Sequence, residues 1–80
     1  MNDATPTVLL VDDEVNITEL FSAWLEDTYD VRTANGGEEA LDALDGGVDV
    51  VLLDRRMPGL SGDEVLDVIR QEGYDCRVAM

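Results

Sequence analysis

The sequence predicts an α/β domain in which the strands of a parallel sheet alternate with helices. Short apolar runs rich in β-branched residues alternate with segments whose apolar residues recur at helical spacing. The connections between them are short, which favours parallel strands joined by right-handed crossovers. We find no internal repeat, linker or low-complexity segment in the 80 residues, so we expect one small domain.

Four strands are predicted. Two are continuous apolar runs, Val8–Val11 and Val50–Leu53, and such runs are typical of strands buried on both faces. Tyr29–Ala34 has the alternation of a short strand, and Cys76–Met80 begins a fourth strand in which the sequence ends. Cys76 is the only cysteine, so it can form no disulfide within the chain, and we interpret it as a small core residue.

The first predicted helix follows Glu14 and ends near Asp27–Thr28. Its apolar residues recur at intervals of three and four, which indicates an amphipathic helix. We place Trp24 in the core rather than on the surface as a ligand platform. The apolar positions of this helix are Ile17, Leu20, Phe21, Trp24 and Leu25.

Two further helices are predicted at Glu38–Leu44 and Asp63–Glu72. Ser61 and Glu64 have the spacing of a capping box before the last helix, and Gly73 suits its C-terminal cap. The residues expected to face the core are Ala40, Leu41, Leu44, Val65, Leu66 and Ile69.

The charge is strongly acidic. The sequence has nineteen acidic residues and five basic residues, all of them arginine, which gives a formal net charge of −14. This charge opposes the compact state by self-repulsion that salt screens, and we interpret it as adaptation to a very salty cytoplasm. It also argues against binding of nucleic acid. The polar segment Met1–Thr7 is no signal peptide, and no apolar run is long enough for a membrane span, so we expect a cytoplasmic protein without a membrane partner.

Three carboxylates follow directly on the two buried strands. Asp12 and Asp13 come after the first strand, and Asp54 comes after the third. If these strands are parallel neighbours, the carboxylates meet at one edge of the sheet, where their repulsion favours a hard cation such as Mg²⁺. Helix capping by Asp12 and Asp13, or a turn role for Asp54, would explain each residue singly. These alternatives account less well for all three acids at matched positions.

Two motifs carry a resemblance to a known family. Val-Asp-Asp-Glu at 11–14 and Leu-Leu-Asp-Arg-Arg-Met-Pro-Gly-Leu-Ser-Gly at 52–62 resemble the receiver domains of two-component response regulators. The resemblance runs over residues 8–80, which leaves 1–7 as a polar tail of a single receiver domain, 1–80. It implies a flavodoxin-like sheet in which the second strand lies at one edge, followed by the first, third and fourth.

The family's chemistry implies roles for four residues. Asp54 would be the phosphoacceptor that takes a phosphoryl group from a sensor histidine kinase, so the domain would take part in phosphoryl transfer without being an enzyme. Asp13 and Asp54 would bind Mg²⁺ directly, Asp12 would act through water, and the backbone carbonyl of Arg56 would complete the protein ligands.

The loop after Asp54 is interpreted residue by residue. Pro58 and Gly59 would shape the loop, and Met57 is assigned to packing. The side chains of Arg55 and Arg56 are expected to be solvated surface charges. This arginine pair, the acidity and the missing lysines together resemble haloarchaeal receivers.

The sequence also departs from the family. A complete receiver has five strands and five helices, with a switch Ser or Thr after the fourth strand and a Lys after the fifth. This sequence ends at Met80 and contains no Lys, so we expect a truncated receiver that lacks the last helices and the fifth strand. The open edge of the fourth strand and the uncovered sheet face would then favour self-association.

Two alternatives to a phosphorylated receiver stay open. The chain could be a non-switching receiver that acts only as an interaction module. It could also be a phosphohydrolase with an aspartyl nucleophile, as in haloacid dehalogenase-like enzymes. Those enzymes place a second Asp two residues after the nucleophile, whereas Arg56 follows Asp54 and Glu14 follows Asp12, so this reading is disfavoured.

Overall fold

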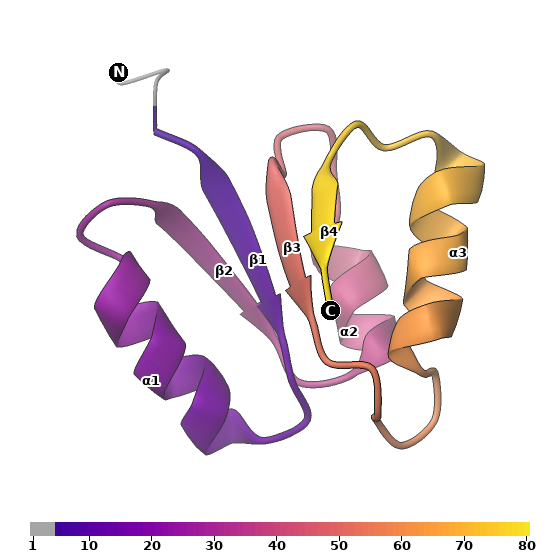
Figure 1. Cartoon of the computed structure of the whole chain (residues 1–80), viewed down its shortest axis with the longest axis horizontal. Coiled ribbons are helices and arrows are strands. Elements are labelled where there is room, and N and C mark those ends of the chain that lie inside the picture. Colours follow the sequence, from indigo (N-terminus) through magenta and orange to yellow (C-terminus); the bar gives the residue numbers. More distant parts are fainter. Residues whose placement is uncertain (1–4) are drawn as a thin grey trace.

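The computed structural model describes residues 5–80, in which strands and helices alternate along the whole chain (Figure 1). This confirms the predicted α/β class. Most of the predicted polar tail, residues 1–4, lies outside the described residues. The elements are β1 (Thr7–Val11), α1 (Val15–Leu25), β2 (Asp30–Ala34), α2 (Gly37–Ala43), β3 (Val50–Leu53), α3 (Gly62–Glu72) and β4 (Arg77–Ala79).

The four strands form one parallel sheet in the order β2-β1-β3-β4, which confirms the flavodoxin-like order implied by the sequence motifs. The chain moves outward from β1 to β2, crosses back to β3 and continues to β4 (Figure 1). The direction of winding therefore reverses between the neighbouring strands β1 and β3. Open α/β sheets bind ligands outside the carboxyl ends of the two strands at such a reversal.

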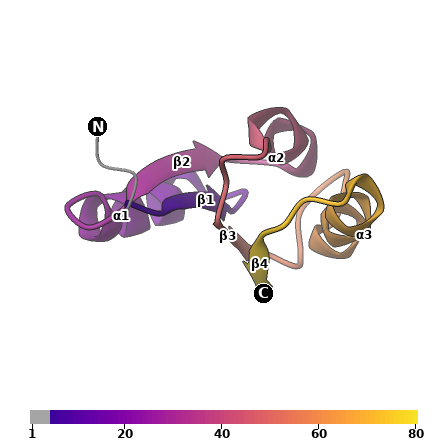
Figure 2. The ribbon, with the colours of Figure 1, turned by 90° about the horizontal axis from the view of Figure 1, so that it is seen from above.

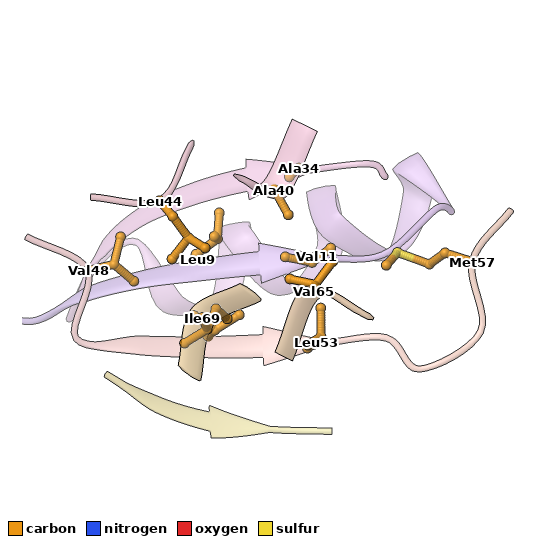
Figure 3. Packing of buried hydrophobic residues seen from close by; sticks show 11 residues of the cluster. Leu9, Val11, Ala34, Ala40, Leu44, Val48, Leu53, Met57, Val65 and Ile69 are labelled. Atoms are coloured by element: carbon orange, nitrogen blue, oxygen red, sulfur yellow. The ribbon is translucent and has the colours of Figure 1, made fainter. Parts of the chain in front are cut away.

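The helices lie on both sides of the sheet, with α1 on one face and α2 and α3 together on the other (Figure 2). The core fills the space between the sheet and the two helices α2 and α3. Alternate residues of β1 and β3 point into it and meet Val65 and Ile69 of α3, both fully buried (Figure 3). The buried cluster consists of Leu9, Val11, Ala34, Ala40, Leu44, Val48, Val51, Leu53, Met57, Val65 and Ile69.

Both ends of α3 have the caps that the sequence predicts. The hydroxyl of Ser61 accepts a hydrogen bond from the backbone N–H of Glu64, and the Glu64 carboxylate accepts one from the N–H of Ser61. At the other end, Gly73 has a φ of 77°, in the left-handed region that side chains disfavour. These caps fix the length of α3 and the place where the loop after β3 must end.

The boundaries of some elements differ slightly from the predictions, and local hydrogen bonds explain these differences. Thr7 belongs to β1 rather than to the tail, because its N–H donates to Oδ2 of Asp49 at 2.8 Å and its carbonyl accepts the Asp49 N–H. α1 ends at Leu25, whose carbonyl accepts the N–H groups of Thr28 and Tyr29 in a closing turn. Cys76 precedes β4, is partly buried and packs against the core, close to its predicted role.

The prediction that Trp24 is a core residue is wrong in this structure. Trp24 is 66% exposed and Phe21 38%, and Thr18 is the one buried residue of α1. Within residues 5–80, no other helix lies beside α1 on its face of the sheet (Figure 2). The two aromatic rings instead pack edge to face, with centroids 5.3 Å apart. The apolar stripe of α1 is therefore only partly covered by the described elements, since Ile17 and Leu25 are partly buried and Leu20, Phe21 and Trp24 are exposed.

No helix among residues 5–80 combines the length and the apolar character that crossing a bilayer requires.

Candidate functional site

The register of the sheet brings the two acidic segments together. Val11, the last residue of β1, pairs with Leu53, the last residue of β3. The next residues, Asp12 and Asp54, therefore leave the sheet at the same level. The N–H of Asp54 donates to the carbonyl of Val11 at 2.9 Å, which extends the ladder by one residue and fixes the acids relative to each other.

The three predicted acids form one cluster. Asp12, Asp13 and Asp54 each have one carboxylate oxygen in the cluster, and these three oxygens lie within 4.8 Å of one another. Asp12 and Asp54 are partly buried, whereas Asp13 is exposed. The sequence argument from matched strand ends thus predicted this juxtaposition correctly.

The surroundings of Asp13 affect the pKa of its carboxyl group. Its pKa is raised above the ordinary value of 3.8, first by partial desolvation and then by the carboxylate of Asp54, with a smaller contribution from Asp12. The backbone N–H of Asp13 acts in the opposite direction. A carboxylate with a raised pKa is disfavoured in its charged form, and a bound cation would relieve that cost.

Backbone N–H groups orient two of the three carboxylates. Oδ1 of Asp12 accepts the N–H of Glu14 at 2.9 Å, which turns the chain from β1 into α1. Oδ1 of Asp54 accepts the N–H of Arg56 at 3.1 Å, which holds the acid at the start of the next loop. Both bonds are of the kind that Asp makes two residues ahead in a turn.

In the loop after Asp54, Met57 is buried, whereas Pro58 and Gly59 are exposed, and their role in shaping the loop stays a prediction. Met57 is 8% exposed and belongs to the core, so packing is its role. Gly59 has a φ of 75°, which explains a glycine there. The side chains of Arg55 and Arg56 are exposed, and Arg55 lies 3.6 Å from the exposed carboxylate of Asp63.

Gly62 makes a close approach that the sequence analysis missed. Its N–H donates to the carbonyl of Arg55 at 3.1 Å. A Cβ at position 62 would collide with the carbonyl oxygen of Asp54 and lie 2.8 Å from the Cα of Arg55. The start of α3 therefore lies directly against the backbone of the candidate acceptor.

Sequence analysis also missed Asn35 and Thr18. Asn35 follows β2 directly, and its side-chain amide donates to the carbonyl of Asp12 at 2.9 Å and to Oγ1 of Thr18 at 3.0 Å. A polar residue at the carboxyl end of a strand next to β1 was the available signal, because that position shares the edge with the acids.

Comparison with known proteins assigns the family. The sequence profile of the response regulator receiver domain matches residues 8–80. A curated relative from the haloarchaeon Haloferax volcanii, described as a putative transcriptional regulator, is 55% identical over 78 residues. The match covers 96% of this chain but 13% of that protein. This chain belongs to the response regulator receiver domain family.

Solved structures agree with this assignment. The response regulator TrrA from Thermotoga maritima, crystallised in complex with Mg²⁺–BeF, superposes with a TM-score of 0.83 at 45% identity. The superposition covers 92% of this chain and 66% of the TrrA chain. TrrA in complex with the histidine kinase ThkA gives a TM-score of 0.81 with the same identity and coverage. The described elements thus match about two thirds of a solved receiver.

Proposed function

We propose that this chain receives a phosphoryl group on Asp54 from a sensor histidine kinase, in a Mg²⁺-dependent reaction of two-component signalling. The observation that carries the proposal is the cluster of Asp12, Asp13 and Asp54 at the reversal between β1 and β3. Membership of the receiver family supports it. In this role the domain accepts a phosphoryl group and is not an enzyme that turns over a substrate.

The residues fit a divalent cation. All three side chains offer carboxylate oxygen, the ligand type that Mg²⁺ prefers, and the exposure of Asp13 leaves room for the waters that Mg²⁺ retains. In our proposal Asp13, Asp54 and the backbone carbonyl of Arg56 hold the ion directly, and Asp12 acts through water. A bound Mg²⁺ would supply positive charge against the acidic cluster and the incoming phosphoryl oxygens.

In our proposal Asp54 is the nucleophile, as the resemblance to the receiver family implies. Its carboxylate is partly buried and is oriented by the Arg56 N–H, whereas Asp13 is exposed. One oxygen of Asp54 forms a bond to phosphorus while the P–N bond of phosphohistidine breaks. The products are an aspartyl phosphate and a neutral histidine on the kinase, in line with general phosphoryl-transfer chemistry.

The kinase partner is supported by the complex of ThkA with TrrA, a receiver that is 45% identical to this chain. High salt as the working medium is supported by the net charge of −14 and by the Haloferax relative. The cytoplasmic location and the lack of a nucleic-acid partner for this segment stay predictions from the sequence.

Self-association also stays a prediction. Among the described residues, β4 pairs with β3 alone, so its other edge has free backbone groups. The uncovered side chains of α1, Phe21 and Trp24, would add apolar area. Light scattering across a concentration series in molar KCl tests this, and a mass equal to the monomer at every concentration would exclude it.

The deciding experiment is intact-mass analysis after incubation with Mg²⁺ and acetyl phosphate in molar KCl. We expect one phosphoryl adduct on the wild type and none on Asp54→Asn. Asp42→Asn removes a charge from an exposed position of α2 outside the acidic cluster, so it serves as the matched control and keeps the adduct. Chelation of the metal should abolish the adduct on every variant.

The outcomes separate the candidate functions. A folded wild type without an adduct would refute the phosphoacceptor role and favour a non-switching interaction module. Continuous release of phosphate from small phosphate esters would instead favour the hydrolase. Equal adducts on the wild type and on Asp54→Asn would place the chemistry at another residue.

A further inference from the structure

The side chain of Asn35 links three segments of the chain at the acidic edge of the sheet. Its amide nitrogen donates to the carbonyl of Asp12, between β1 and α1, and to the hydroxyl of Thr18, within α1. Its own backbone N–H donates to Oε1 of Glu39 in α2, at 3.0 Å. One partly buried residue thus connects the acidic loop to α1 through its side chain and to α2 through its backbone.

The main chain of Asp12 is held from two sides because of this link. Its N–H donates to the carbonyl of Ala34 at 3.1 Å, the last backbone bond between β1 and the end of β2. Its carbonyl has left the ladder and accepts the side chain of Asn35 instead. The side-chain amide therefore extends the pairing of the two strands beyond the point where their backbones separate.

Thr18 fixes the direction of the Asn35 amide. It is 3% exposed, and its hydroxyl donates to the carbonyl of Val15 at 3.0 Å while accepting from Asn35. Because that hydroxyl uses its proton on Val15, the oxygen is available only as an acceptor for the amide. This arrangement holds the donor end of Asn35 toward both Thr18 and Asp12.

We propose that Asn35, oriented by Thr18, is a positioning residue that holds the Asp12–Asp13 turn against Asp54 and so sets the affinity for the divalent cation. The inference deepens the proposed function and rests on it. The side chain of Asp13 is exposed, so it owes its position to the backbone that carries it. The Asn35 bond acts on that backbone one residue before Asp13.

The test measures cation affinity directly, with Mn²⁺ as the probe and its electron paramagnetic resonance signal as the readout, in molar KCl. Asn35→Leu keeps a similar volume but removes the donor, and we expect the dissociation constant to rise about tenfold, as for other groups that orient metal ligands. Asn16→Leu makes the same chemical change at an exposed position of α1 and should leave the affinity unchanged.

A second pair of variants keeps the inference testable if Asn35→Leu does not fold. Thr18→Val keeps the shape and loses the hydroxyl, so we expect a rise of several-fold in the Mn²⁺ dissociation constant. Thr18→Ser retains the hydroxyl and should bind within about twofold of the wild type. A purely structural role for Thr18 would not distinguish these two variants at the cation while both remain folded by circular dichroism.

The failure of the inference differs from the failure of the proposed site. If Asp13→Asn weakens binding but Asn35→Leu and Thr18→Val bind like the wild type, the positioning role is refuted and the site stands. If Asn35→Leu does not fold, the Thr18 variants decide. Equal Mn²⁺ dissociation constants for Thr18→Val and Thr18→Ser then refute the positioning role. If the wild type binds Mn²⁺ no better than Asp13→Asn, both the site and the inference fall.

Discussion

Replacing Gly62 by alanine tests how tightly α3 lies against the candidate acceptor. Two effects of the change oppose each other. In the middle of a helix alanine is favoured over glycine by about 0.5–1 kcal/mol, which is an upper limit for Gly62 as the first residue of α3. A Cβ at this position would collide with the carbonyl oxygen of Asp54 and approach the Arg55 Cα to 2.8 Å. Overpacking of this kind typically costs about 1–3 kcal/mol.

We expect the collision to outweigh the helix preference. The groups that a Cβ would meet are backbone atoms, which cannot rotate away as the end of a side chain could. Gly62→Ala should therefore lower the free energy of unfolding by about 2 kcal/mol, near the upper end of the overpacking range less the helix gain. It should also displace Asp54 and lower the yield of the phosphoryl adduct.

The measurement is urea unfolding in molar KCl, followed by circular dichroism. Gly46→Ala is the matched control, because nothing lies within 4 Å of a Cβ there and its φ is not in the left-handed region. We expect this control to be neutral or slightly stabilising. If Gly62→Ala has the same urea midpoint of unfolding and the same yield of phosphoryl adduct as the wild type, the close approach is refuted as a constraint on the site.

Further predictions concern packing, pH and salt. Ile69→Ala should lower the free energy of unfolding by about 2–5 kcal/mol, because Ile69 is fully buried, whereas Trp24→Ser should change it by less than about 1 kcal/mol; equal losses in urea unfolding would contradict the burial. The N–H and hydroxyl of Ser61 lower the pKa of Glu64 below the ordinary 4.5, so its stabilising contribution is present above that value and is lost as the pH falls through the lower folded-state pKa. The stability difference between wild type and Glu64→Gln should accordingly shrink on acidification, and a constant difference in urea unfolding from pH 7 to pH 3 would speak against it. Raising KCl from about 0.1 to 2 M should raise the thermal midpoint by screening the charge of −14, and a falling midpoint would count against self-repulsion as the dominant charge effect.

Local patterns in the sequence were enough for the fold and for the acidic cluster. The apolar runs that end at Asp12 and Asp54 placed both acids at strand ends, and the spacing of Ser61 and Glu64 specified the start of α3. Both features depend on residues adjacent in the chain or on one general rule of parallel sheets.

Contacts between distant segments were harder to predict. The bond from Asn35 to Asp12 joins residues 23 positions apart, and the same asparagine is equally suited to a turn before Gly36 and Gly37. The exposure of Trp24 was missed for a different reason. Helical spacing shows that α1 has an apolar side, but the identity of the element that covers that side is not encoded in the helix itself.

The unequal burial of β1 and α1 has a consequence for local opening. All five residues of β1 are buried, whereas Thr18 is the one buried residue of α1. Backbone amides of a poorly buried helix exchange their hydrogens through small openings, and those of a central strand through nearly global unfolding. We therefore expect α1 to exchange deuterium well before β1, with the acidic turn as the boundary. A cation bound at Asp13 would tie that turn to β3, and slower exchange in the first turn of α1 would then report its occupancy without any phosphoryl transfer.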